Sequence, residues 1–174
     1  MSVTGAPRSG GRPGGEGPGA PGQPKSKARE WDFPGLGAMT KVETAFGEFP
    51  AQTLRKGDRV RTRKGTFADI RWIDRVVLNE EFLQHHPEAQ PVAIPANALG
   101  RGLPKQEVIL SPGQHILVEG GFGPPREMTA IDLLESGKAI RKPEMMITYT
   151  FFLCAMPVIV RCSGLWVRIV PPAQ

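Results

Sequence analysis

The sequence predicts a compact all-β fold with one or two short helices. From Thr40 onward, short segments rich in Val, Ile, Phe and Thr are separated by Gly, Pro or charged turns, which is the pattern of many short strands. The 174 residues include 21 Gly and 18 Pro, a content that requires many turns or a section without a core. One convincing helix, about two turns long, is recognisable by its cap.

The first 30 residues are predicted to form a disordered tail. Residues 1–24 contain 8 Gly and 5 Pro and no aliphatic side chain larger than that of Val3, so they cannot bury enough apolar surface to offset their ordering entropy. The tail is basic, since it carries +3 of the net charge of +5. The remaining residues suffice for one domain, which we expect over residues 35–170.

The strands are expected where apolar and β-branched residues cluster between turn signals. They are Thr40 to Thr44, Arg59 to Arg63, Phe67 to Arg75, Val92 to Ile94, Val108 to Leu110, His115 to Val118, Met146 to Leu153, Val158 to Cys162 and Trp166 to Val170.

The helix signals are local. Thr129 is a good N-cap, Asp132 stands three residues later as in a capping box, and Gly137 provides a stop, which together predict a short helix. Asn79 to His86 could form a further turn, and Asn97 to Leu99 another.

Several functional classes are disfavoured by composition. The densest basic run, Arg55 to Lys64, is better explained as solvated edges around a turn than as a nucleic-acid surface. The longest uncharged stretch, Met145 to Val160, has 16 residues broken by polar groups and Pro157, which is too short for a membrane helix. The chain has no signal peptide, so we expect a cytoplasmic protein.

Several short motifs follow one another in a recognisable order and spacing from Thr40 to Val118. The opening reads Thr40-Lys-Val-Glu-Thr, Gly47-Glu-Phe-Pro and Leu54-Arg-Lys-Gly-Asp-Arg-Val. It is followed by Ile70-Arg-Trp-Ile, Pro91-Val-Ala-Ile, Asn97-Ala-Leu-Gly, Val108-Ile-Leu-Ser-Pro and Gln114-His-Ile-Leu-Val. This arrangement is similar to Hint domains, the shared module of hedgehog autoprocessing regions and inteins, and in particular to the bacterial Hint-domain proteins.

The resemblance implies a horseshoe-like β fold and an intramolecular rearrangement of one peptide bond. Active members use a Cys or Ser that attacks its own preceding carbonyl, and a Thr-x-x-His element whose His assists the leaving amide nitrogen. The nucleophile should stand four or five residues before Thr40, where this chain reads Gly35-Leu-Gly-Ala-Met. Because none of these residues offers a nucleophile, we expect the chain to lack autoprocessing activity.

The element that bears the histidine is matched by Ser111-Pro-Gly-Gln-His115, which is one residue longer than Thr-x-x-His. Ser111 and His115 are therefore the catalytic candidates, and both are vestigial if the chemistry is lost. The extra residue would rotate the imidazole or be absorbed as a bulge. The simpler interpretation, which we prefer to a catalytic role, is that His115 begins a strand and forms a local hydrogen bond.

No metal or cofactor site is expected. Adjacent histidines such as His85 and His86 point apart on a regular backbone, and Cys154 and Cys162 are not spaced as a chelating pair. Both cysteines lie in apolar sequence, where a thiol behaves as a small hydrophobe. Trp31 is expected to anchor the tail on the domain rather than to bind a ligand.

The end of the sequence departs from the Hint pattern. Met156 and Pro157 stand where a second His is expected, and the last residues are Pro171-Pro-Ala-Gln174 rather than His-Asn, so we expect no splicing by asparagine cyclisation. Because proline donates no ladder hydrogen bond, the strand there should begin at Val158. Two alternatives stay open: a non-catalytic β scaffold that binds a protein partner, and an active self-cleaving element with an unrecognised nucleophile.

Overall fold

The computed structural model describes residues 31–170. The predicted disordered tail, residues 1–30, lies outside the described residues. The prediction of an all-β fold with short helices is confirmed: strands dominate, and α1 (Glu80–His85) and α2 (Ala130–Glu135) are the two α-helices of the described part. No helix among residues 31–170 has the length and apolar character needed to cross a membrane.

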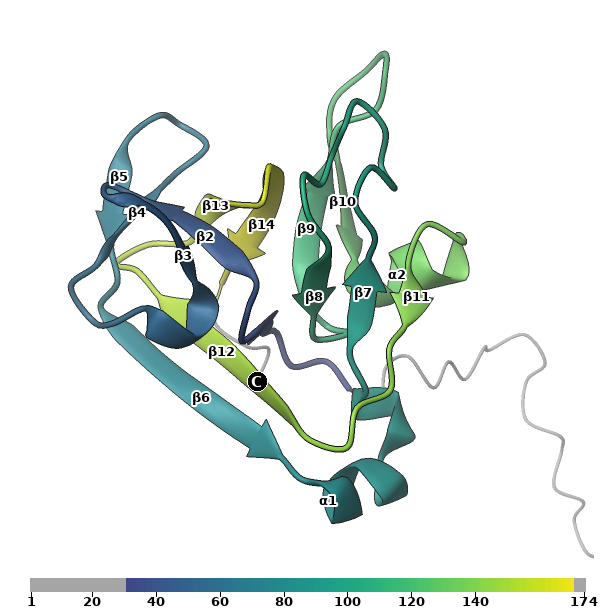
Figure 1. The fold of residues 1–174 in the computed structure, drawn as a ribbon. Coiled ribbons are helices and arrows are strands. Elements are labelled where there is room, and N and C mark those ends of the chain that lie inside the picture. Colours follow the sequence, from purple (N-terminus) through teal and green to yellow (C-terminus); the bar gives the residue numbers. More distant parts are fainter. Residues whose placement is uncertain (1–30, 171–174) are drawn as a thin grey trace, which may run out of the picture.

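The strands form two curved antiparallel sheets (Figure 1). The six-stranded sheet has the order β11 (Ile140–Arg141), β7 (Val92–Ile94), β8 (Val108–Leu110), β1 (Leu36–Gly37), β12 (Ile147–Leu153) and β6 (Trp72–Leu78). The eight-stranded sheet has the order β10 (Arg126–Thr129), β9 (His115–Val118), β14 (Leu165–Ile169), β13 (Val158–Cys162), β2 (Lys41–Thr44), β4 (Arg59–Arg61) and β5 (Phe67–Asp69), with β3 (Gly47–Pro50) paired to β2.

The core lies between the sheets and follows the alternation of the strands. Val42, Val60, Cys162 and Val167 are fully buried and face inward from four strands of the larger sheet, because successive side chains of a strand point to opposite faces. Phe152 is the largest fully buried side chain and comes from β12 of the smaller sheet.

A second, smaller cluster lies beneath α1. Its buried members include Leu83 and Tyr149, and Trp31 packs against it from the start of the described chain. The Trp31 indole makes an edge contact with the Phe82 ring, with centroids 5.8 Å apart. Its Nε1–H donates to the Ser111 hydroxyl at 2.9 Å. Trp31 therefore packs on the domain, and the expectation that it anchors the tail concerns residues outside the described part of the chain.

The structure also corrects the expected strand Phe67 to Arg75, which is two strands. The chain breaks at Ile70, whose N–H donates to the Asp58 carbonyl while its carbonyl accepts from the Gly57 N–H. Two other expectations hold: Asn97 to Leu99 forms a turn, and β13 begins at Val158, directly after Pro157.

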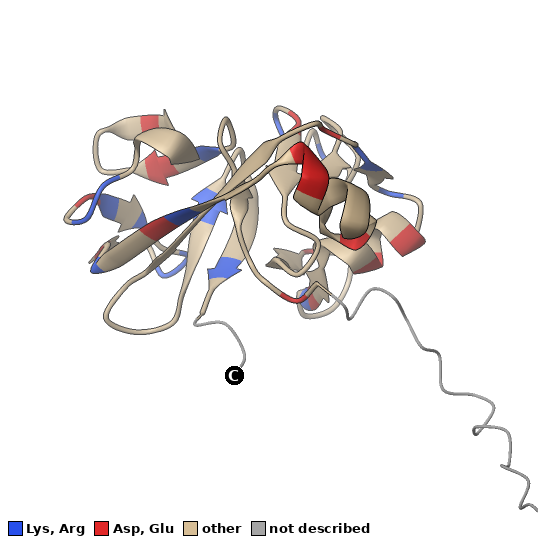
Figure 2. Ribbon diagram, turned by 90° about the horizontal axis from the view of Figure 1, so that it is seen from below, with Lys and Arg blue, Asp and Glu red and all other residues tan. Residues whose placement is uncertain are grey.

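Charged residues are distributed unevenly over the two sheets (Figure 2). Acidic groups occupy both helices, whereas arginines line the strands of the eight-stranded sheet. Many of these arginines have acidic partners: Arg61 with Glu43 at 3.6 Å, and Arg63 with Glu119 at 2.8 Å. The outer face of this sheet therefore carries several local ion pairs between oppositely charged neighbours.

Candidate functional site

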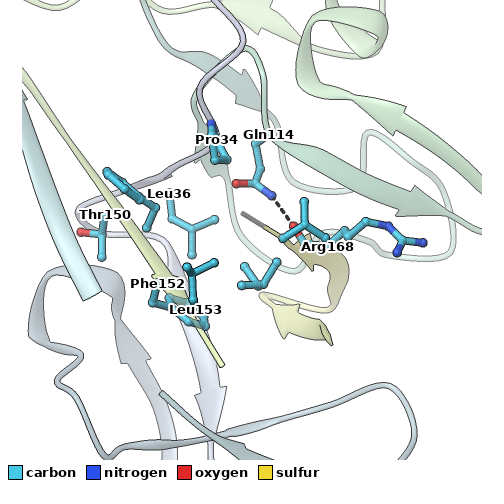
Figure 3. A pocket seen from close by; sticks show the side chains of 10 residues that line it. Pro34, Leu36, Gln114, Thr150, Phe152, Leu153 and Arg168 are labelled. Atoms are coloured by element: carbon cyan, nitrogen blue, oxygen red, sulfur yellow. Dashed lines mark hydrogen bonds between the residues drawn. The ribbon is translucent and has the colours of Figure 1, made fainter. Parts of the chain in front are cut away.

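The candidate site surrounds the entry of the chain into β1. This strand lies between β8 and β12 in the six-stranded sheet. The turn from β8 to β9, residues 111–114, and the end of β14 close over the same point. A small cavity there is lined by Pro34, Leu36, Gln114, Phe152 and Arg168 (Figure 3). Segments from the beginning, middle and end of the described chain thus meet at one place.

Gln114 is the polar centre of this site. Its side chain is 2% exposed, and its Oε1 accepts from the Gly35 N–H at 2.9 Å. Its Nε2 donates to the Arg168 carbonyl at 2.8 Å, the bond drawn in Figure 3. Nε2 also donates to the His115 carbonyl at 3.1 Å. The carboxamide therefore bonds the residue directly before β1 and a residue of β14, the last strand, at the same time.

Gly35 has no room for a side chain. A Cβ placed on its backbone would lie 2.8 Å from the Tyr149 Cβ and 3.6 Å from the Ser111 Cβ. The first distance is shorter than real Cβ atoms tolerate, and Tyr149 is held in place because its hydroxyl donates to the Ala89 carbonyl at 2.8 Å. The backbone at Gly35 is thus packed directly against its neighbours.

Ser111 is fully buried and lies beside the same segment. Its Oγ–H donates to the Phe33 carbonyl at 2.8 Å, while its oxygen accepts from Trp31 Nε1. Its backbone N–H donates to the Gly35 carbonyl at 3.0 Å. The hydroxyl therefore fixes the segment before Gly35 and has both of its hydrogen-bonding roles occupied.

His115 is the first residue of β9 and lies on the exposed side of that strand. Its neighbour Ile116 is buried, so the imidazole points to the opposite face. Nδ1 lies 3.3 Å from Glu127 Oε1, and the same carboxylate oxygen pairs with Arg168 Nε at 2.6 Å. Gln114, rather than His115, is the residue whose side chain contacts the Gly35 amide.

Gln114 was not among the sequence-based candidates, although the spacing held a signal. Counted from Ser111, the family pattern Thr-x-x-His places its last member at position 114, which is a glutamine here. The sequence analysis instead matched the family histidine to His115, one residue later. Ser111 does lie at the site, and the catalytic role assigned to Ser111 and His115 stays a prediction.

The two cysteines lie elsewhere in the fold. Burial is the main reason that the pKa of the Cys154 thiol is raised to about 11, and burial also raises the pKa of the Cys162 thiol. Both thiols are therefore neutral near pH 7 and poor nucleophiles. Among residues 31–170, no group of three or more His, Cys, Asp or Glu side chains could hold a metal ion.

The chain is similar to inteins of known structure. The gp41-1 intein has 11% sequence identity and a TM-score of 0.48, with 78% of this chain and 98% of the intein covered. The MchDnaB-1 intein has 9% identity and a TM-score of 0.49, with 78% and 99% covered. No curated protein matches the sequence. The family model of the Hint domain matches residues 34–170, and the chain therefore belongs to the Hint-domain family.

Proposed function

We propose that this chain is a Hint domain that does not rearrange its own backbone and serves as a non-catalytic β scaffold. The observation that carries the proposal is the environment of Gly35: the residue has no side chain, no space for one, and an amide N–H that is held by Gln114. The place at which an active relative would break a peptide bond is here tightly packed around Gly35, and we call it the β1 junction.

The first chemical step cannot begin at this junction. An N-to-O or N-to-S shift at the Pro34–Gly35 bond needs an oxygen or sulfur on residue 35 to attack the Pro34 carbonyl carbon, after which the C–N bond breaks. A hydrogen atom is all that Gly35 offers. The nitrogen must also gain a proton as it leaves, and the carboxamide of Gln114 does not ionise near neutral pH as an imidazole does.

Ser111 is an alternative nucleophile beside this segment, and its contacts argue against that role. A serine needs a base that removes its proton before it attacks a carbonyl carbon. The Ser111 hydroxyl hydrogen is already engaged in a hydrogen bond to the Phe33 carbonyl oxygen. The imidazole of His115, which could act as the base, lies 3.3 Å from Glu127 instead. We therefore assign Ser111 and Gln114 the role of positioning residues that hold the entering chain.

A scaffold role fits these contacts. Trp31, Ser111 and Gln114 fix the direction in which the chain enters the domain, so that whatever precedes Trp31 starts from a defined point on the surface. A domain of this kind could display the preceding segment to a protein partner, which is the function class that we favour over self-cleavage.

The purified chain should keep its intact mass of 18.9 kDa. Thioester and ester intermediates are released by dithiothreitol or hydroxylamine, so overnight treatment with either reagent should produce no fragment that mass spectrometry detects. A new N-terminus at Gly35, or at any residue from Phe33 to Thr40, would contradict the proposal and would point to an unrecognised nucleophile.

Substitution of Gln114 should destabilise the domain in graded steps. Gln114→Ala removes three hydrogen bonds and leaves the buried Gly35 N–H unpaired, so the free energy of unfolding should fall by about 2–4 kcal/mol. Gln114→His can still accept from Gly35 but can donate to one carbonyl at most, and should lose less. Urea titration measures the free energy of unfolding of the unmodified chain and of both variants.

Gln84→Ala is the control for these variants, because the Gln84 side chain is exposed and makes a single 3.3 Å bond with Glu80. Its unfolding free energy should change by less than about 0.5 kcal/mol. An equally small change for Gln114→Ala would refute the role of Gln114 at the junction.

A methyl group at Gly35 should also be costly. Gly35→Ala forces its Cβ against Tyr149, and overpacking of this kind destabilises by about 1–3 kcal/mol. Gly120→Ala is a matched control, because a Cβ at Gly120 would meet no atom within 4 Å, and it should leave stability unchanged or slightly increased. Thermal unfolding by circular dichroism distinguishes the two, and a neutral Gly35→Ala would show that the junction has space for a nucleophile.

A further inference from the structure

A second cavity lies away from the β1 junction, between the loop that joins β7 to β8 and the strands β9 and β14. Its apolar lining includes Leu103, Leu117 and Trp166, and its charged lining includes Arg101 and Arg161. The cavity has a volume of about 140 Å³ and opens to solvent, which is comparable with apolar cavities that accept a single benzene-sized group. It shares no lining residue with the cavity at Pro34.

The loop that forms one wall is held in a fixed position. Leu103 packs on Gly164 in the β13–β14 turn so closely that a Cβ on Gly164 would lie 2.7 Å from Leu103 Cδ2. The Lys105 N–H donates to the Ser163 carbonyl, and the Leu99 N–H donates to the Leu103 carbonyl, both at 2.9 Å. The cavity is therefore preformed in the free protein.

Arg101 occupies a backbone conformation that suits glycine better. Its φ is 56°, between Gly100 at 85° and Gly102 at 74°, and a side chain in this left-handed region is strained. The residue is exposed and, within the part of the chain that the structure describes, takes part in no ion pair. Strain of this kind concentrates at sites where a side chain has a task other than folding.

The unpaired charge of the cavity is positive. Glu119 also lines it, but the Glu119 carboxylate is bonded to Arg63 at 2.8 Å. The guanidinium of Arg161 lies 5.4 Å from the centre of the Trp166 ring, and its Nε is 3.9 Å from Glu43. Arg101 thus remains available next to an aromatic and aliphatic wall.

We propose that this cavity binds an apolar carboxylate. The carboxylate accepts hydrogen bonds from the guanidinium of Arg101, the group best suited to bidentate recognition of two oxygens. The apolar body lies against Leu103, Leu117 and Trp166. Two sources have this chemistry, a free small carboxylic acid and the C-terminal residue of a peptide.

The probe is N-acetyl-L-phenylalanine, titrated into the full chain and followed by NMR. A compound of this size should bind with a Kd of about 1 mM or lower. Chemical shifts should change at the Trp166 indole N–H and at the amides of residues 100–102, and not at Gly35. N-acetyl-L-phenylalanine amide, which lacks the carboxylate, should bind at least tenfold more weakly.

Arg101→Gly separates binding from folding. This variant removes the guanidinium and relieves the strained backbone, so it should weaken binding at least tenfold while the Tm stays equal or rises. Arg55→Gln, an exposed arginine outside this cavity, is the control and should bind as the unmodified chain does. Equal affinity of Arg101→Gly, equal affinity for the amide, or no binding of the acid at 20 mM would each overturn the proposal.

The source of the carboxylate is tested with a hexapeptide that ends in phenylalanine, in its free and amidated forms. If the free-acid peptide binds more tightly than N-acetyl-L-phenylalanine, the cavity binds the C-terminal residue of a peptide. If the free-acid peptide binds more weakly, the cavity binds a small carboxylic acid. Either result supports the proposal, provided that the amidated peptide binds at least tenfold more weakly than the free form.

Discussion

One buried carboxamide joins the beginning of the domain to its end. Gln114 accepts a hydrogen bond from Gly35 in front of β1 and donates one to Arg168 in β14, residues separated by most of the described sequence. A neutral amide suits this position because it is both a donor and an acceptor. Since the Gly35 amide is removed from solvent, leaving it unpaired would cost more than the bond itself contributes.

The same constraint supports the proposal that this chain does not perform the family chemistry. A self-processing site must keep a nucleophile free to move, a base to activate it and an acid for the leaving nitrogen. At this junction the hydroxyl of Ser111, the amide of Gly35 and the carbonyl of Arg168 all have partners, and Tyr149 fills the space that a nucleophile would use. These three occupied groups support the proposed scaffold role over a reactive centre.

Much of the fold could be predicted because strand signals are local. The segments Val92–Ile94, Val108–Leu110 and Val158–Cys162 were expected with their observed bounds, since each is an apolar run bordered by turn residues. The capped helix α2 was recognised at Thr129, where the capping box is present. In contrast, Arg126–Thr129 was not expected as a strand, because its charged residues show no alternation and it depends on pairing with β9.

The site was harder to predict than the fold. The absence of a Cys, Ser or Thr from Gly35 to Met39 is visible in the sequence, and Ser111 was recognised there as a candidate, although its burial was not. The contact between Gln114 and Gly35 joins residues 79 positions apart, and neither residue type is distinctive by itself. His115 drew attention as an ionisable group, although its place at the start of β9 directs the imidazole toward Glu127. Only the three-dimensional packing shows that Gln114, and not its neighbour His115, contacts the Gly35 amide.

Hydrogen exchange at the Gly35 amide tests the central claim most directly. If Gln114 holds this N–H in the folded domain, the Gly35 amide should exchange as slowly as the paired amides of β12 in NMR experiments at neutral pH. The protection should be lost selectively in Gln114→Ala, while β12 remains protected. Exchange of the Gly35 amide in the unmodified chain at the rate of an unfolded peptide would contradict the account, because the junction would then be open to water and to chemistry.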